Sequence, residues 1–314
     1  MIKENYDFYS PYNFKLRNLD PKIQYQLDLL ASHDLITRKH SENVANLVYR
    51  LCEYLRCNSK FILYATTCAL LHDIGKLFIP LNILTKPDAL TDEEFEIMKK
   101  HTTLGYELCY KDLKLRPYCD GALYHHESLN GTGYPNGVTK KEIPYVAQII
   151  RVADEYDAIV AKRQYKTHIN ISETLKVLIK DAQPEEYIKT VALDQLSKDS
   201  KVGKINAKIL KTFFKVIIDD TMYEIYCIKE YVSHLINEQE RLKLIDNFHN
   251  KMLTAKNDKK REYYLNGMKV LFDKGETEEN YKDVLDEYTK AIDNKKFMIA
   301  KLYDEIKIIK KLKV

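Results

Sequence analysis

The sequence predicts an all-α protein in which a helical bundle is followed by a C-terminal helical hairpin or coiled-coil extension. Glycine and proline, which interrupt helices, contribute only 9 and 8 of the 314 residues. Apolar residues recur at three- and four-residue spacing through most of the chain, which is the period of one helix face. In the last third this spacing becomes heptad-like, as in helices that pack lengthwise against each other.

We expect three parts in this chain: an N-terminal arm at residues 1–24, a helical domain at residues 25–220 and the C-terminal extension at residues 221–314. Pro21 is suited to open the first helix, because its fixed φ matches the first helical turn. A polar, glycine-containing stretch at Lys198–Lys204 predicts a break before the last helix of the domain.

Two further helices lead to the first residues of chemical interest. One carries an apolar stripe with His40 on the same side. The next begins near Ser59 and is apolar on nearly all sides through Leu71, which indicates burial. It ends at His72-Asp73, so the sequence predicts a carboxylate at the end of a buried helix.

The middle of the domain contains shorter helices. Thr91–Glu94 has the T-x-x-E form of a capping box and predicts a helix that carries Phe95, Met98 and His101. A short helix is expected from about residue 117 to residue 126.

A loop and a long helix complete the part of the domain that carries polar motifs. Glycines and a proline between Ser128 and Thr139 exclude regular structure there. Pro144 starts a helix, on which Asp154 and Asp157 share one face because they are three residues apart.

The C-terminal extension carries two apolar series at helical spacing. The first is Ile228, Val232, Leu235 and Leu242, and the second, interrupted by Lys295, is Tyr281, Leu285, Tyr288, Ile292, Ile299, Leu302, Ile306 and Ile309. Gly275 and its acidic neighbours are expected in a turn between helices. Heptads do not choose a partner, so a homodimer through these helices and packing within one chain fit equally well.

The composition excludes several classes of function. A hydrophobic content of 45% with 31% charged residues is ordinary for a soluble protein. A net charge of +4 is too small to indicate a DNA- or RNA-binding protein. The apolar run Phe61–Leu71 is about half of the roughly 20 residues that a membrane span needs, so no span is expected.

Six cysteines without a C-x-x-C pair, and no recognisable signal peptide, favour a cytoplasmic location.

Imidazole and carboxylate side chains supply a candidate metal site. The candidate ligands are His40, His72, Asp73, His101, His125, His126 and Asp154. A lone histidine is more often a hydrogen-bonded core or surface residue, but coincidence explains the complete set poorly. An unpaired buried carboxylate at Asp73 would be costly, and its two oxygens could bridge two ions. Imidazole plus carboxylate suits Fe, Mn, Zn or Ni. Lys76 beside such ions indicates an anionic ligand.

Two motifs carry a resemblance to a known family. The first is His72-Asp73-Ile74-Gly75-Lys76, and the second is His125-His126-Glu127-Ser128-Leu129-Asn130-Gly131-Thr132-Gly133-Tyr134-Pro135. The chain resembles the HD-GYP family, a branch of the HD metal-dependent phosphohydrolases, whose second motif reads H-H-E-x-x-D-G-x-G-Y-P. Only Asn130 departs from it, where the family has Asp. Blocks around His40, His101 and Asp154 also match in order and spacing. The resemblance covers roughly residues 25–220 and implies an HD-type helical bundle.

The resemblance implies an enzyme, a phosphodiesterase that hydrolyses cyclic di-GMP or a related cyclic dinucleotide to linear pGpG or onward to GMP. It implies two divalent transition metals per chain, Fe or Mn, with Zn or Ni as alternatives. One ion would be held by His40, His72, Asp73 and Asp154, and the other by Asp73, His101, His125 and His126. Asp73 and Lys76 would be catalytic, and the substrate would be bound by Lys76, Tyr134, Asp157, Arg163 and Lys166.

The chemistry of these groups agrees with that activity. Two metals roughly 3.5–4 Å apart can generate a bridging hydroxide at neutral pH and polarise phosphoryl oxygens. Lys76 can neutralise charge that develops on those oxygens. Arg163 offers a bidentate fork for phosphate and Lys166 a point charge. Some family members bind a third metal through a glutamate at the position of Ile36, which cannot ligate, so we expect two metals and mainly pGpG.

Two alternatives stay open. One is an HD hydrolase that acts on another nucleotide or phosphoester, which a comparison of cyclic and simple nucleotides as substrates would reveal. The other is a catalytically silent signalling protein that binds a cyclic dinucleotide without cleaving it. The presence of every expected ligand for two metals disfavours this second alternative.

Overall fold

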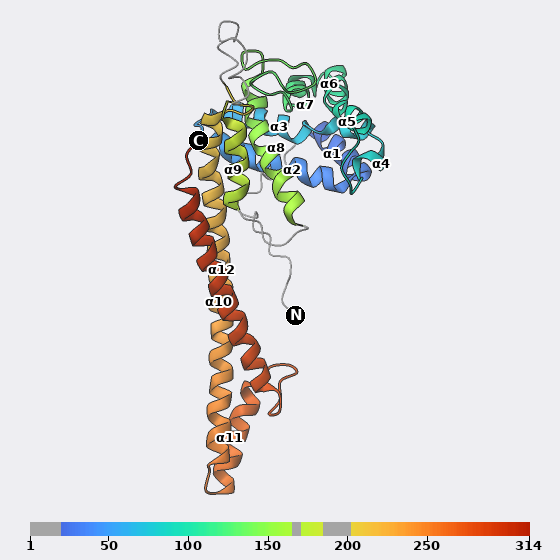
Figure 1. The fold of residues 1–314 in the computed structure, drawn as a ribbon. Coiled ribbons are helices and arrows are strands. Elements are labelled where there is room, and N and C mark those ends of the chain that lie inside the picture. Colours follow the sequence, from blue (N-terminus) through green and yellow to red (C-terminus); the bar gives the residue numbers. More distant parts are fainter. Residues whose placement is uncertain (1–19, 165–170, 185–201) are drawn as a thin grey trace. The chain divides into compact units, whose positions relative to one another are not determined.

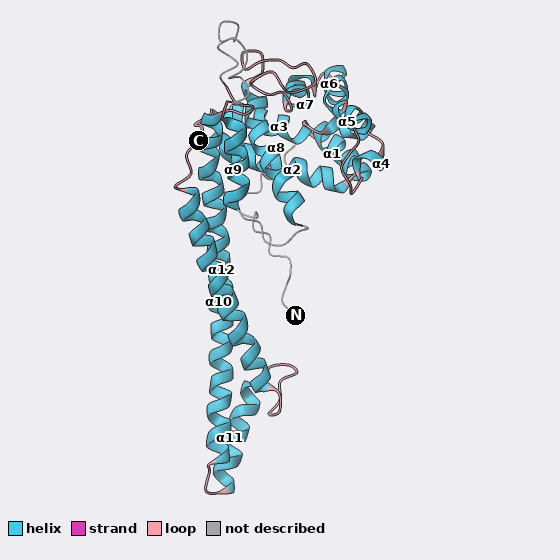
Figure 2. Cartoon of the chain, in the orientation of Figure 1, coloured by secondary structure: helices cyan, strands magenta, loops and turns pink. Residues whose placement is uncertain are grey.

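The computed structural model describes residues 20–164, 171–184 and 202–314, with the side chains of 161–164 left out. Every regular element among the described residues is helical (Figure 2), so the predicted all-α fold is confirmed. The elements in chain order (Figure 1) are α1 (Pro21–His33), α2 (Leu35–Tyr54), α3 (Ser59–Leu71), η2 (Ile74–Phe78), α4 (Leu81–Leu84), α5 (Asp92–Lys99), α6 (His101–Lys111), η3 (Arg116–Tyr118), α7 (Cys119–Tyr124), α8 (Tyr145–Gln164), α9 (Ile171–Ala182), α10 (Ala207–Leu253), α11 (Asp258–Leu271) and α12 (Tyr281–Ile309).

The chain divides into two compact units. The first comprises the residues up to Asp219 together with Ile308–Val314, and the second comprises Asp220–Lys307. The helix α10 is continuous across this division, so the domain end predicted at residue 220 falls inside a helix. The helical apolar spacing does not stop at that point, which explains why the backbone does not break there.

The core of the first unit lies between α2, α3 and α8. Val48 of α2, Leu70 and Leu71 of α3, and Ile149 of α8 are fully buried. The near-continuous apolar sequence predicted burial along the whole of α3, and this holds only from Ala65 onward, because Leu63 is 55% exposed. His72 and Asp73 therefore follow directly from seven consecutive buried residues, Ala65–Leu71.

Side-chain caps begin the helices that lead to the site. Asp34 precedes α2, and its carboxylate accepts hydrogen bonds from the amides of Ile36 and Thr37 at 3.3 and 2.9 Å. Asn58 caps α3 through the amide of Phe61 at 2.9 Å. Each cap satisfies amides that have no partner inside the helix, a contribution of about 1 kcal/mol.

The prediction of one helix through Phe95 and His101 is wrong, because α5 ends at Lys99 and α6 begins at His101. The amide of Lys100 bonds to the carbonyl of Ile97 at 3.1 Å, which tightens the turn. The new direction brings the backbone of His101 against η2. A Cβ at Gly75 would lie 1.9 Å from the His101 carbonyl oxygen, so only glycine permits this approach.

The second unit packs the predicted apolar series within one chain. Ile228, Val232 and Leu235 of α10 form a cluster with Ile292 of α12, so this intrachain packing is present whatever the oligomeric state. A homodimer through these helices stays a prediction. Gly275 adopts a φ of 92° in the connection between α11 and α12, as expected for a turn glycine.

One stretch of the described residues, Ser59–Phe78, is long and apolar enough by composition to cross a membrane. It comprises α3 and η2, and 61% of it is buried inside the protein. Core helices of soluble proteins meet the same criterion, so this is weak evidence for a span.

Candidate metal centre

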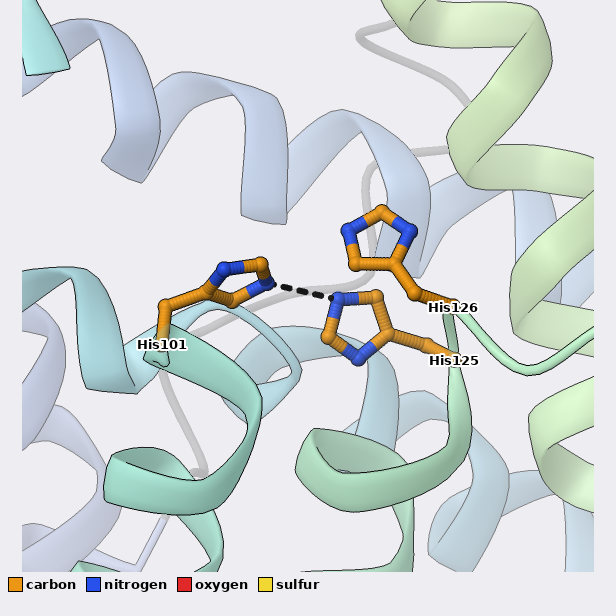
Figure 3. A group of neighbouring side chains, drawn as sticks. All are labelled: His101, His125 and His126. Carbon is orange, nitrogen blue, oxygen red and sulfur yellow. Dashed lines mark hydrogen bonds between the residues drawn. The ribbon is translucent and has the colours of Figure 1, made fainter. Parts of the chain in front are cut away.

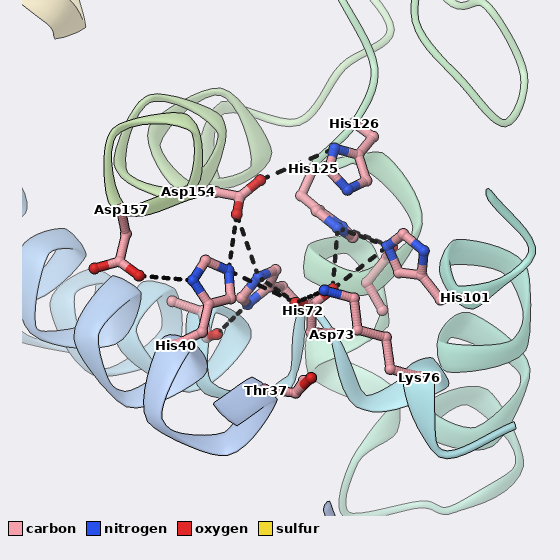
Figure 4. A network of polar contacts seen from close by, with 12 residues as sticks. Thr37, His40, His72, Asp73, Lys76, His101, His125, His126, Asp154 and Asp157 are labelled. Carbon is pink, nitrogen blue, oxygen red and sulfur yellow. Dashed lines mark hydrogen bonds and ion pairs between the residues drawn. The ribbon is translucent and has the colours of Figure 1, made fainter. Parts of the chain in front are cut away.

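The seven predicted ligands come from five separate places in the first unit and meet at one point (Figure 4). They are His40 on α2, His72 and Asp73 after α3, His101 at the start of α6, His125 and His126 after α7, and Asp154 on α8. The helix α7 ends at Tyr124, His125 caps it with helical backbone angles, and the rings of His125 and His126 turn toward the same site.

Asp73 lies at the centre of this group and is 1% exposed. Its Oδ2 faces the Nε2 atoms of His72 and His40 at 3.4 and 3.6 Å. Its Oδ1 faces the Nε2 atoms of His101 and His125 at 3.4 and 3.8 Å. The two oxygens of one carboxylate therefore serve two different sets of imidazoles.

Asp154 provides a second carboxylate between the same sets. Its Oδ1 lies 3.0 Å from the Nε2 of His40 and 3.8 Å from that of His72. Its Oδ2 lies 3.9 Å from the Nδ1 of His126. Asp154 is 6% exposed.

Backbone carbonyls fix the tautomers of three histidines. The Nδ1 of His72 contacts the carbonyl of Ala69 at 2.7 Å, and that of His101 contacts the carbonyl of Met98 at 2.7 Å. His125 Nδ1 lies near the carbonyls of Gly121 and Ala122, at 3.0 and 2.9 Å. A carbonyl can only accept, so each Nδ1 carries the hydrogen and each Nε2 presents a lone pair to the centre.

These lone pairs approach each other closely. The Nε2 atoms of His101 and His125 are 3.2 Å apart (Figure 3). Two lone pairs at this distance repel unless a cation lies between or beside them. In addition, His72 Nε2 and Asp73 Oδ1 are buried without a hydrogen-bond partner, which costs free energy in a protein interior.

The donor set fits divalent transition metals. Two sets of three ligand atoms each lie within 4.8 Å of one another: His40, His72 and Asp73, and His101, His125 and His126. Neutral imidazole with carboxylate suits Fe, Mn, Zn and Ni, and a nitrogen held by a carbonyl on its other side is the usual state of a ligating histidine.

The electrostatics keep Asp73, His101 and His125 in the forms that bind metal. Burial favours the neutral acid of Asp73, but Lys76 and His72 hold its pKa well below the usual range. Burial lowers the pKa of His101 to about 4 and that of His125 well below its usual value, so both are neutral at pH 7. His40 differs: burial opposes its charge, yet hydrogen bonds with Asp154 and Asp157 raise its pKa to about 10.

Lys76 places an ammonium group beside the candidate ligands. Its Nζ lies 2.5 Å from Asp73 Oδ2, and its side chain is 19% exposed. It is therefore placed beside the carboxylate that would join the two ligand sets, and it is partly exposed.

Glu127 holds the loop that contains Gly133-Tyr134-Pro135, called here the Gly-Tyr-Pro loop, beside the candidate ligands. This buried carboxylate accepts hydrogen bonds from the amides of Asn136 and Val138 at 2.7 and 3.2 Å. The Tyr134 amide bonds to the carbonyl of His126 at 3.2 Å, and the two rings lie 4.7 Å apart. Glu127 was missed by the sequence reasoning, although its place directly after two histidines was a usable signal.

Asn130 replaces the family's aspartate without loss of the turn. Its Oδ1 accepts hydrogen bonds from the amide and the hydroxyl of Thr132, at 3.2 and 2.7 Å. An amide oxygen thus fills the acceptor position in this turn.

The remaining predicted site residues lie outside the ligand cluster or outside the described residues. Asp157 Oδ2 accepts from the Nδ1 of His40 at 2.7 Å, so its carboxylate lies behind a ligand rather than at the centre. Its predicted contact with substrate is untested. The Arg163 side chain and Lys166 lie outside the described residues. Ile36, which stands where some family members have a third-metal glutamate, is 69% exposed.

An ion pair on α8 was also not predicted from the sequence. Arg151 Nε donates to Glu155 Oε1 at 2.7 Å, and the two residues lie on either side of Asp154 in the sequence. Burial raises the pKa of Glu155, and its Oε2 is buried without a hydrogen-bond partner. The four-residue spacing of opposite charges was the available signal.

The sequence of this chain is similar to those of known proteins. Residues 24–190 match the sequence profile of a family described as HD domain. The chain is 40% identical over 153 residues to a cyclic di-GMP phosphodiesterase of Thermotoga maritima, covering 48% of this chain and 42% of that protein. It is 40% identical over 154 residues to the cyclic di-GMP phosphodiesterase PdeB of Borreliella burgdorferi, covering 49% and 40%.

A third relative has a different substrate in its name. The chain is 35% identical over 142 residues to 3'3'-cGAMP-specific phosphodiesterase 3 of Vibrio cholerae, covering 45% of this chain and 31% of that protein. The chain thus spans less than half the length of each of these three relatives.

Proposed function

The chain belongs to the HD domain family, and from that premise we propose that it is a metal-dependent phosphodiesterase that hydrolyses a cyclic dinucleotide, with cyclic di-GMP as the first candidate. The observation that carries this proposal is the position of Asp73, whose two oxygens face two separate sets of imidazole nitrogens. Relatives at 40% identity with this activity in their names support the choice of substrate.

We assign the ligands as the resemblance implied. His40, His72, Asp73 and Asp154 would hold one divalent cation, and Asp73, His101, His125 and His126 the other. Fe or Mn is the proposed metal, with Zn or Ni as alternatives. When bound, such ions lower the pKa of water and polarise phosphoryl oxygens.

The protein's own groups then have defined tasks. The Lys76 ammonium would turn from Asp73 to a phosphoryl oxygen and neutralise charge that develops there. Burial raises the pKa of Tyr134, so its hydroxyl stays protonated and can donate to the substrate. Asp157 would orient His40 by accepting its Nδ1–H. Arg163 and Lys166 remain proposed phosphate contacts on the strength of the sequence.

We propose linear pGpG as the main product. Ile36 stands where some family members have a third-metal glutamate, and it offers no ligand atom. Two ions suffice for one in-line cleavage of a phosphodiester, whereas a further round would need pGpG to bind again as a substrate.

We propose that the reaction takes place in the cytoplasm. All six cysteines are free thiols, and Cys52, Cys68 and Cys109 are fully buried. Free thiols are typical of proteins in a reducing compartment.

The hybrid 3'3'-cyclic GMP-AMP is a second candidate substrate, because one relative is named for it. Full-length protein loaded with Fe or Mn should be given cyclic di-GMP, the hybrid and a simple nucleotide in parallel, with products separated by ion-exchange chromatography. The proposal predicts pGpG from cyclic di-GMP. Metal-loaded protein that binds but does not cleave any cyclic dinucleotide would favour the silent signalling protein instead.

A further inference from the structure

Phe95 is an exposed aromatic residue on a helix with no buried residue of its own. It lies on α5 and is 43% exposed. The Thr91–Glu94 capping box begins this helix, and Lys86 holds Glu94 at 2.6 Å. Local polar contacts therefore stabilise α5, and the helix does not depend on burial of the Phe95 ring.

A line of rings connects Phe95 with the candidate metal ligands. The ring of His126 lies 4.7 Å from that of Tyr134, with 30° between their planes. The Tyr134 ring lies in turn 6.1 Å from Phe95 in an edge-to-face contact. Phe95 is the outer end of this line, one aromatic contact beyond the Gly-Tyr-Pro loop.

A cation accompanies these rings. The Nζ of Lys99 lies 5.1 Å from the ring centre of Phe95 and 5.8 Å from that of Tyr134. Lys99 also pairs with Glu96 at 2.5 Å, but the Glu96 side chain is 67% exposed. Such a solvent-screened pair is weak, so an anion can replace it.

The same pair of residue types occurs elsewhere in the chain without this context. Phe297 on α12 is 62% exposed, and Lys301 places its Nζ 4.7 Å from that ring. A Phe–Lys pair four residues apart is therefore unremarkable by itself. What distinguishes Phe95 is its continuity, through Tyr134, with a candidate metal ligand.

We propose that Phe95 and Lys99 form a nucleobase-binding subsite, in which one base of the cyclic dinucleotide stacks on the Phe95 ring and Lys99 contacts an adjacent phosphate. This inference rests on the proposed function, which supplies the ligand. Every nucleobase has a flat π-face, and aromatic side chains with a neighbouring cation are the usual platform for it. Stacking of this kind makes the loss of one ring cost about tenfold in affinity.

The chain has no tryptophan, which makes a direct test available. Phe95→Trp introduces a single indole at the proposed subsite, and Phe297→Trp introduces one at the matched exposed position. Metal-loaded full-length protein is mixed with cyclic di-GMP in a stopped-flow instrument, and fluorescence is read before turnover. Saturable quenching in Phe95→Trp but not in Phe297→Trp supports the subsite, and equal responses overturn it.

Kinetics give a second, independent readout. Phe95→Ala should raise KM about tenfold with kcat changed less than about twofold, and Phe95→Tyr should restore the wild-type KM. Lys99→Gln should raise KM by a smaller factor that disappears at high salt. Unchanged KM values in Phe95→Ala and Lys99→Gln would remove both residues from the subsite.

The two hypotheses fail in different ways. Quenching of Phe95→Trp by cyclic di-GMP without hydrolysis by the wild type keeps the subsite and refutes the phosphodiesterase. Hydrolysis by the wild type with no quenching and no KM effect refutes the subsite alone. Neither hydrolysis nor quenching refutes both.

Discussion

The two units bury charge in opposite ways. In the first unit, Asp73 is buried with an oxygen that has no hydrogen-bond partner, facing imidazole nitrogens that present lone pairs. In the second unit, Arg241 donates to both oxygens of Glu276 at 2.6 Å and to the carbonyl of Leu271 at 2.7 Å. The protein completes the second network itself, whereas the first is complete only with cations added.

This difference separates a structural polar network from a functional one. Buried polar groups are normally paired, and the exceptions need a reason. The buried side-chain atoms without a partner among the described residues belong to Ser41, His72, Asp73 and Glu155, all in the first unit. Two of these residues are candidate ligands, and Glu155 is adjacent to a third.

The largest expected effect comes from Asp73→Asn. The amide cannot bridge two cations, so activity should fall about a thousandfold, or roughly 4 kcal/mol of transition-state stabilisation. The metal-free protein should also lose stability, because the change breaks the ion pair between Asp73 and Lys76, and the metal-loaded protein should lose more because a metal ligand is removed as well. Initial rates, and thermal unfolding with and without metal, measure these effects. Similar losses of stability in the metal-free and metal-loaded variant would contradict a metal role.

Asp157→Asn should have a smaller effect on the same site. It weakens the hold on His40 Nδ1 without removing a ligand, so metal affinity should fall about 10- to 100-fold. Competition with a chelator measures this affinity. A loss of substrate affinity with unchanged metal affinity would instead favour the substrate-binding role that the sequence suggested for Asp157.

Arg241→Met tests the polar network of the second unit, in which Arg241 is paired with Glu276. It leaves Glu276 without its partner, and because the pair is partly exposed the unfolding free energy should fall by about 1–2 kcal/mol. Metal content should be unchanged, since the Arg241 network belongs to the second unit. Urea unfolding and metal analysis of the same samples provide the check, and a loss of bound metal would break the distinction between the networks.

The smallest predicted effect is a pH dependence of the same pair. The hydrogen bonds from Arg241 lower the pKa of Glu276 from its ordinary value of 4.5. Its stabilisation is therefore present above about pH 4.5 and lost as pH falls through the lowered folded-state pKa. The stability difference between wild type and Glu276→Gln, below about 1 kcal/mol at pH 7, should shrink between pH 5 and pH 3. A difference that stays constant would exclude this linkage.

The sequence predicted most of the fold because the periodic patterns were strong. The buried helix before His72, the loop after Ser128 and the helix that carries Asp154 all appear where spacing and turn residues indicated. The break at Lys100 was not predicted. It lies beside the close contact between Gly75 and the His101 backbone, which joins two segments distant in sequence and which no local pattern specifies.

The candidate site was predictable as a set of residues but not as a geometry. Motif spacing named the seven ligands, and the structure brings all seven together. The tautomers depend on carbonyls such as those of Ala69 and Met98, which no motif specifies. Likewise, heptads in α10 and α12 could not distinguish a partner within the chain from one on another chain.

The sharing of Asp73 by two cations is tested most directly by metal stoichiometry. Wild type and Asp73→Asn should be reconstituted with Fe or Mn, freed of excess metal and analysed by plasma mass spectrometry alongside protein quantification. We expect two equivalents per wild-type chain and the loss of bound metal from both ligand sets in the variant. Two equivalents retained by Asp73→Asn, or none bound by the wild type, would contradict a shared carboxylate at the centre of this site.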